Sequence, residues 1–251
     1  IQVPKSLKWT YPIVNLFHKT YINKYDELWI PDVEGEPSLS GKLSHPADVK
    51  IKTQYIGFLS RFTSEIKDDI KIFEYLVILS GPEPQRTIFE DIIIKQAHEV
   101  EGNIAIFRAK PELDATPDNE PSNVYYFNHV DDVMFRKIVS KSRRIVCRGG
   151  YSSLMDLINI NRNAYLVPTP GQTEQEYLAE YLTEKGLFNY CKQKDFKLKR
   201  NINNKKTRQH QSKKVLHSKG NYLQSKKATY EMEEAICNSY TPKEVDIQNI
   251  Y

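Results

Sequence analysis

The sequence predicts an α/β protein built on a Rossmann-like parallel sheet with helices on both faces. Three observations support this prediction. Short apolar runs rich in β-branched residues recur between residues 52 and 190, polar turns with Gly or Pro follow them, and most turns lead into a stretch of helical periodicity. Alternation of strand, turn and helix is typical of a parallel sheet whose ligand crevice lies at the carboxyl ends of its strands.

The composition bounds the class of protein. With 251 residues and 39% hydrophobic content, the chain can bury one large core or two small ones. It contains no apolar run of about eighteen residues and no signal peptide, so we predict no membrane-spanning segment. Cys147, Cys191 and Cys237 lie far apart without metal-ligand spacing, which favours single thiols in a reducing cytosol. We therefore expect a cytoplasmic globular protein without a metal site.

The amino-terminal part predicts a helix over residues 11–25 and a short strand over 27–30 that ends at Pro31. Residues 33–49 are rich in Gly, Pro and Ser, the composition of an interdomain loop, and we place a hinge there. Because the first residue is Ile1 rather than Met, we expect a piece of a longer protein. The expected units are 1–32, the end of an amino-terminal domain; 33–50, the interdomain loop; 51–190, the ligand-binding domain; and 191–251, a basic segment with a carboxy-terminal helix.

The elements of the ligand-binding domain follow from the same periodicities. The predicted strands span residues 52–56, 75–79, 103–108, 124–127, 145–147, 164–167 and 188–190. The predicted helices span 85–100 and 132–140, begin near 152 and near 173, and end with 228–238. We expect Asp131 to cap the helix at 132. We expect Glu83 to interact with the dipole at the first turn of the helix at 85 rather than to act as a catalytic acid.

The stretch Arg144–Tyr177 predicts an anion site. A buried strand is followed by the tight turn Gly149–Gly150, and we expect Ser152 or Ser153 to cap the next helix. Free N–H groups at a helix start suit a phosphate or diphosphate, and Asp156, about one turn along, can accept hydrogen bonds from ribose hydroxyls. The same pattern also occurs in α/β proteins that bind nothing there.

A second unit repeats this plan. After the strand at 164–167 comes the turn Pro168–Gly171, and we expect Thr173 to cap a helix with Glu176 in the capping-box position. Gln175 and Glu176 would then face the same crevice as the first unit.

Two sequence blocks resemble a known family. GGYSSLMD at residues 149–156, followed by PTPGQTEQEY at 168–177, is similar to the donor-binding half of glycosyltransferase family 28. The resemblance spans about residues 26–190 and is most specific over 128–133 and 147–177. It implies the carboxy-terminal half of a GT-B glycosyltransferase, with an amino-terminal acceptor domain that supplies the general base.

The resemblance also implies roles for individual residues. Arg61 would approach the diphosphate, the backbone of Val130 would read the uracil edge, and Asp156 would hold the ribose. At residues 80–84 the sequence keeps Ser80–Gly81 of a glycine-rich family loop and replaces the rest with prolines, which leaves fewer N–H donors. The full implied donor site comprises Arg61, Ser80, Gly81, Val130, Gly149, Gly150, Tyr151, Ser152 and Asp156, with Gln175 and Glu176 at the sugar hydroxyls.

The implied reaction is transfer of a hexosyl group, with N-acetylglucosamine as the expected sugar, from a UDP-sugar to an acceptor hydroxyl. The resemblance implies inversion and no metal or other cofactor. The expected partners are the nucleotide-sugar donor and a glycan or lipid-linked glycan acceptor, which places the protein in the cytoplasm or peripherally at the inner membrane surface.

Three alternatives stay open. The first is a nucleotide-sugar hydrolase or epimerase of the same fold, and the second is a non-catalytic donor-binding subunit of a two-subunit transferase. The third is an anionic-surface binder that uses residues 192–227, which hold thirteen Lys or Arg against one acid, although a solvated loop explains that charge as well. Aromatic residues are sparse in this segment, so we expect no nucleic-acid partner.

Overall fold

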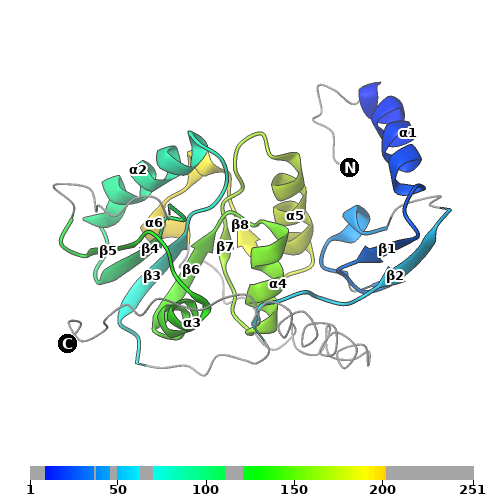
Figure 1. Ribbon diagram of the computed structural model, residues 1–251. Coiled ribbons are helices and arrows are strands. Elements are labelled where there is room, and N and C mark those ends of the chain that lie inside the picture. The colour runs from blue at the N-terminus through cyan, green and yellow to red at the C-terminus, as the bar shows by residue number, and fades with distance from the viewer. Residues whose placement is uncertain (1–8, 37, 46–49, 63–69, 111–120, 202–251) are drawn as a thin grey trace.

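The computed structural model describes residues 9–36, 38–45, 50–62, 70–110 and 121–201 (Figure 1). The predicted helix at 228–238 and most of the basic segment lie outside the described residues. Within the described ranges, no helix combines the length and the apolar character that crossing a membrane requires.

A six-stranded sheet forms the centre of the molecule, in the order β5-β4-β3-β6-β7-β8. Every neighbouring pair is parallel, which confirms the predicted fold class. Ile78 lies in register with Phe107 on one side and Cys147 on the other, so the three central strands end at one level. The strands are β3 (Phe73–Ile78), β4 (Asn103–Phe107), β5 (Val124–Phe127), β6 (Ser142–Cys147), β7 (Tyr165–Leu166) and β8 (Asn189–Tyr190).

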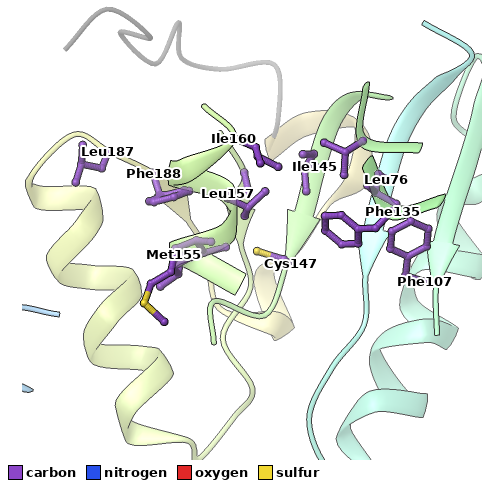
Figure 2. Close-up of a cluster of buried hydrophobic side chains, with 14 of the residues drawn as sticks. Leu76, Phe107, Phe135, Ile145, Cys147, Met155, Leu157, Ile160, Leu187 and Phe188 are labelled. Carbon is purple, nitrogen blue, oxygen red and sulfur yellow. The ribbon is translucent and has the colours of Figure 1, made fainter. Parts of the chain in front are cut away.

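Helices cover both faces of this sheet, and each face has its own apolar core. Alternate strand residues point to opposite faces: Tyr75 and Val77 pack in the core with α2 and α6, whereas Leu76 packs in the core with α3, α4 and α5. Figure 2 shows this second core, in which Cys147 lies buried among apolar side chains, and burial raises the pKa of its thiol to about 12. The helices are α2 (Gln85–Ala97), α3 (Asp132–Ser140), α4 (Tyr151–Asn159), α5 (Thr173–Glu184) and α6 (Leu198–Asn201), with the 3-10 turn η3 (Gln193–Asp195).

A smaller unit precedes the sheet. It consists of α1 (Tyr11–Ile22), β1 (Glu27–Ile30), the 3-10 turn η2 (Gly41–Leu43) and β2 (Lys52–Tyr55). β1 and β2 pair in parallel, from Glu27 opposite Lys52 to Ile30 opposite Tyr55, and form a separate two-stranded sheet. The predicted strand at 52–56 therefore exists, but it pairs with β1 and not with the six-stranded sheet.

Two predicted helix caps are wrong and one is confirmed. The N-cap of α4 is Gly150 and that of α5 is Gln172, and neither makes a side-chain capping bond. Gly149 and Gly171 have φ values of +78° and +84°, so the chain reverses before the expected caps and both helices begin early. Ser152, Ser153 and Thr173 are therefore helical residues. Asp131, in contrast, caps α3 by accepting the Met134 N–H at 2.7 Å.

The chain that follows β1 is organised by one buried carboxylate, that of Asp32. This side chain accepts hydrogen bonds from the N–H groups of Val33, Leu39 and Ser40 and from the hydroxyls of Ser40 and Ser44. We call residues 31–36 and 38–45 the Asp32 loop. Because its carboxylate satisfies donors across the whole segment, this polar loop has a defined conformation although its only regular element is the short turn η2.

Tyrosine hydroxyls attach the Asp32 loop to two helices of the main domain. The attachments are Tyr151 of α4 donating to the Pro31 carbonyl at 2.8 Å, Tyr181 of α5 donating to the Ser38 carbonyl at 3.0 Å, and the Lys42 N–H donating to Tyr177 of α5 at 2.8 Å. A Cβ at Gly41 would lie 2.5 Å from the Tyr177 hydroxyl, so only glycine permits this close approach. The segment in which the sequence places a hinge is thus bonded to α4 and α5.

Candidate functional site

The topology places a crevice between β3 and β6. From β3 the chain proceeds through β4 to the edge strand β5, then returns to β6 and continues through β7 to the other edge. The strand order therefore reverses between β3 and β6, and ligands of open α/β sheets bind at the carboxyl ends of the strands at such a point. Ser80–Gly81 follow β3 and Gly149–Gly150 follow β6, so both predicted loops meet here.

The turn after β6 leaves the start of α4 open. No side chain caps this helix, and its first turn contains no acid. A Cβ at Gly150 would meet no atom within 4 Å, so there is free space in front of the helix. The amide N–H groups at the start of α4, together with the positive end of the helix dipole, are therefore available to an anion.

Arg148 lies buried beneath this turn, although the sequence analysis did not single it out. Its guanidinium donates to the Gln193 side chain and the Gln85 carbonyl, both at 2.6 Å, and to the Val167 carbonyl at 3.3 Å. It also lies 4.2 Å from the ring centroid of Phe89. Desolvation lowers its pKa to about 10, so the side chain stays charged at neutral pH. Arg148 thus ties together the segments that follow β3, β6, β7 and β8.

Asp156 and Arg61 meet on the α4 side of the crevice, 95 residues apart in sequence. Asp156 accepts the Ser60 hydroxyl at 2.8 Å and Arg61 Nε at 2.9 Å, and Arg61 Nη1 reaches Asp132 at 3.1 Å. Burial raises the pKa of Asp156, while the Ser60 and Arg61 bonds act in the opposite direction. Ser60 and the Arg61 side chain and N–H occupy three of the roughly four acceptor positions of the carboxylate, which leaves room for a ribose hydroxyl.

Gln175 and Glu176 hold the loop between β7 and α5. Gln175 accepts the Thr169 N–H at 2.9 Å and donates to the Gln172 side chain at 2.5 Å, while Glu176 accepts the Gly171 N–H at 3.3 Å. The two side chains predicted to bind a sugar thus also have a structural role, because they fix the backbone around the entrance to α5.

Gly81 brings the loop after β3 close to the loop after β7. It has a φ of +95°, and a Cβ there would lie 3.4 Å from the Thr169 hydroxyl, which is buried and has no hydrogen-bond partner within the described chain. Next to it, Glu83 accepts the Thr87 N–H at 3.1 Å and pairs with Arg86 at 2.8 Å, which lowers the pKa of Glu83 to about 2. This confirms Glu83 as a partner of the first turn of α2.

Val130 lies apart from the other predicted residues, after the edge strand β5. Its backbone has no hydrogen-bond partner among the described residues, and so its peptide groups are available to a ligand. The preceding segment is fixed by Arg108, which is buried, pairs with Glu90 at 2.5 Å and donates to the Asn128 side chain at 3.1 Å.

The side chain of Tyr151, another predicted donor residue, points to the Asp32 loop, and burial raises the pKa of its phenol. Only its backbone therefore belongs to the α4 turn. Ser152 is exposed in the first turn of α4, where its hydroxyl can reach a ligand. Across the ranges that the structure covers, no cluster of metal-ligating side chains occurs.

Residues 116–236 match the family model described as the glycosyltransferase family 28 C-terminal domain. The matched segment contains α3, β6, the glycine turn, α4 and the loop that leads into α5. A comparison with curated protein sequences found no match.

Solved structures of glycosyltransferases share the fold. The glycotransferase of kitacinnamycin has a TM-score of 0.52 at 13% identity, over 73% of this chain and 49% of its own. The calicheamicin glycosyltransferase CalG4 has a TM-score of 0.51 at 15% identity, over 76% and 48%. MurG of Acinetobacter baumannii also has a TM-score of 0.51 at 15% identity, over 76% and 57%. The chain thus spans about half the length of these proteins and has the fold of a GT-B carboxy-terminal half.

The contacts that the sequence analysis missed around the crevice are all long-range. Ser60 and Asp132 complete the Arg61 cluster, Arg148 braces the glycine turn, and Thr169 faces Gly81. No local pattern marks these partners. The signal that was available is the basic residue directly before the Gly-Gly turn, since a charged side chain at the end of a buried strand requires partners.

Proposed function

We propose that this chain binds the nucleotide-sugar donor of a glycosyl transfer reaction. The observation that carries the proposal is the uncapped start of α4 behind Gly149–Gly150, at the point where the strand order reverses, with the Asp156 carboxylate about one turn along. This arrangement offers N–H donors to a diphosphate and an acceptor to a ribose on one helix. The family 28 match supports the same assignment.

In the proposed complex, UDP-N-acetylglucosamine lies across the carboxyl ends of the strands from β5 to β6. The backbone of Val130 binds the uracil edge, Asp156 binds the ribose, and Gln175 with Glu176 binds the hexose hydroxyls. Ser80, Gly81 and the α4 turn line the diphosphate. These assignments combine the family resemblance with the open backbone of Val130 and the remaining acceptor position of Asp156.

The proposed step is direct displacement with inversion. The acceptor hydroxyl oxygen bonds to the anomeric carbon as the bond to the diphosphate oxygen breaks, and the hydroxyl proton passes to a base in the acceptor half. The leaving diphosphate gains negative charge, which the α4 N–H groups and Arg61 would stabilise without a divalent cation. For Arg61 this requires only a shift of its half-exposed guanidinium away from the exposed Asp132.

We propose a glycan or lipid-linked glycan as acceptor, with the protein at the cytoplasmic side of the membrane.

Calorimetric titration with UDP, UDP-N-acetylglucosamine and ADP, each with magnesium and with EDTA, tests the donor assignment. We expect both uridine ligands to bind equally well in the two buffers and ADP to bind much more weakly. Failure of both uridine ligands to bind, or equal binding of ADP, would contradict the proposal. Release of free sugar from the UDP-sugar without any acceptor would indicate a hydrolase instead.

A further inference from the structure

A cavity of about 510 Å³ lies between the Asp32 loop and α5, and we call it the α5 pocket. Its volume is within the range of about 300–1,000 Å³ that is typical of small-molecule sites. In Figure 1, α5 lies on the side of the main domain that is nearest to β1 and β2. The loops after β3 and β6 contribute no residue to its lining, so the α5 pocket is distinct from the proposed diphosphate site.

One face of α5 forms the first wall of the pocket. Tyr177 and Tyr181 lie one turn apart, and their rings are stacked with centroids 5.9 Å apart and an angle of 8° between the planes. Both hydroxyls are bonded to the backbone of the Asp32 loop, which fixes the position of the rings. Glu180 and Glu184 continue the same face at helical spacing. This wall therefore combines aromatic surface with carboxylate acceptors.

The Asp32 loop supplies polar groups to the second wall. His45 Nδ1 lies 2.7 Å from the Gly41 carbonyl oxygen, which can only accept, so Nδ1 carries a proton. Its Nε2 has no partner among the described residues and can bond to a ligand. The Lys42 ammonium here and the Glu184 carboxylate on the first wall also make no hydrogen bond or ion pair within the described ranges. The pocket thus offers both a donor and an acceptor to a ligand.

The charges of the α5 pocket disfavour an anionic ligand. Three carboxylates line it, those of Glu36, Glu180 and Glu184, against the single ammonium of Lys42. Their negative potential repels phosphate groups, so a second nucleotide site is not expected here. These acids are also not arranged as a metal site, because the described part of the chain contains no group of side chains that could hold a metal ion.

A cationic ligand also fits less well, because the chain already supplies a cation. Lys185 Nζ pairs with Glu36 at 2.9 Å and lies 5.4 Å from the ring centroid of Tyr181. An organic cation in this position would have to displace Lys185 from both partners. The pocket is therefore better suited to a neutral molecule.

The remaining groups match the chemistry of a sugar. Sugar hydroxyls can donate to the Glu184 carboxylate and to His45 Nε2, and they can accept from the Lys42 ammonium. The C–H groups on one face of a pyranose ring form an apolar surface that can pack against the tyrosine pair, since aromatic rings contribute mainly apolar contact area. A neutral saccharide thus uses both kinds of surface in the pocket.

We propose that the α5 pocket binds a neutral saccharide, with one sugar ring against Tyr177 and Tyr181. Saccharide binding does not depend on the proposed donor binding, because none of the proposed donor residues lines the pocket. The source of the saccharide rests on the proposed function: it would be part of the acceptor glycan. Tyr177 directly follows Glu176, which is proposed to bind the transferred hexose, so donor and acceptor sugars would lie along the same helix.

Titration followed by ligand-observed NMR tests the proposal. The 251-residue protein would be titrated with three neutral disaccharides, N,N′-diacetylchitobiose, cellobiose and maltose, and with choline as an organic cation. We expect saturable binding of at least one disaccharide and none of choline. Failure of all three disaccharides to bind, or binding of choline in competition with them, would overturn the inference.

A second titration at saturating UDP separates the α5 pocket from the donor crevice. We expect the saccharide affinity to be unchanged, because the two sites share no lining residue. Loss of saccharide binding when UDP is added would place the saccharide in the donor crevice and would overturn the inference. Saccharide binding by a protein that does not bind UDP would contradict the proposed donor function and would support the α5 pocket.

Substitutions on opposite walls assign the binding to the pocket. Glu184→Ala and Lys42→Ala remove exposed side chains that have no partner in the described structure, so the fold should be kept while saccharide affinity falls about tenfold. Glu174→Ala is the matched control, because Glu174 is an exposed acid in the first turn of α5 that does not line the pocket. It should bind the saccharide as the parent does. Parental affinity in both pocket variants would overturn the inference.

Discussion

The Asp32 loop and the Gly149–Tyr151 turn are both polar segments at strand ends, yet they differ in how their hydrogen-bonding groups are satisfied. In the Asp32 loop, a buried carboxylate receives five donors from its own chain. At the turn, the start of α4 has no cap and faces open space at Gly150. A saturated polar loop has no donors left for a ligand, whereas the N–H groups at the start of α4 are available to one.

The arginines Arg148 and Arg61 show the same contrast. Arg148 is 1% exposed and bonds three acceptors that belong to different loops, so it is a structural brace. The Arg61 side chain is 44% exposed and lies between Asp156 and the exposed Asp132. Arg61 can turn its Nη1 from the exposed Asp132 to a ligand while its Nε keeps the bond to the buried Asp156.

The largest expected effect is a loss of stability in the Asp32 loop, where all the hydrogen-bonding positions of the carboxylate are used. Asp32→Ala removes the acceptor of five donors in a buried position, so we expect the free energy of unfolding to fall by about 3–4 kcal/mol in urea denaturation. Glu34→Ala, at an exposed residue of the same loop, serves as the control and should change it by less than about 0.5 kcal/mol. An Asp32→Ala variant as stable as the parent would contradict the structural role of this carboxylate.

The next effect tests the proposed ribose contact. Asp156→Ala should weaken UDP binding by about 1.5–3 kcal/mol, the range for a hydrogen bond to a charged group, without unfolding the domain. Calorimetric titration measures the affinity, and circular dichroism checks the fold. Ser60→Ala removes one partner of Asp156 and keeps the carboxylate, so it should lose less affinity. Equal affinity of Asp156→Ala and the parent protein would remove Asp156 from the site.

A pair of glycine substitutions tests whether the turn before α4 binds a ligand or has only a structural role. Gly150 has a φ of −64° and open space at its Cβ position, so Gly150→Ala should change stability by less than about 1 kcal/mol. If a diphosphate occupies that space, the same methyl group should weaken UDP binding about tenfold, or 1.4 kcal/mol.

Gly149→Ala is the comparison for Gly150→Ala. Gly149 has a φ of +78°, a backbone conformation that is strained for any residue with a side chain. It should lower the free energy of unfolding by about 1–3 kcal/mol. The assignment of the turn to the diphosphate fails if Gly150→Ala binds UDP as the parent does while remaining folded.

The smallest effect concerns Glu83, whose pKa the Arg86 pair lowers to about 2 from an ordinary 4.5. Because the folded value lies below the unfolded one, the stabilisation is complete above pH 4.5 and is lost as the pH falls towards 2. The side chain is 45% exposed, so the effect should be about 0.5 kcal/mol or less. The Tm difference between parent and Glu83→Gln should therefore disappear on acidification, and a pH-independent difference would contradict this assignment.

Several elements of the fold could be read from local sequence. The strands β1 and β5 and the helix α3 have the bounds that periodicity predicts, and Asp131 caps α3 as expected. These features depend on residues a few positions apart. The family 28 blocks also lie within short stretches, so they led to the correct fold class and to the turn at Gly149–Gly150.

Tertiary structure alone decided which side chains meet. The contact between Arg61 and Asp156 joins residues 95 positions apart, and β2 pairs with β1 rather than with the main sheet. Periodicity records which face of an element is buried, but it does not record which element covers that face. The sequence by itself therefore determined the sheet, the helices and the glycine turn, whereas the pairing of distant charges and strands required the packed chain.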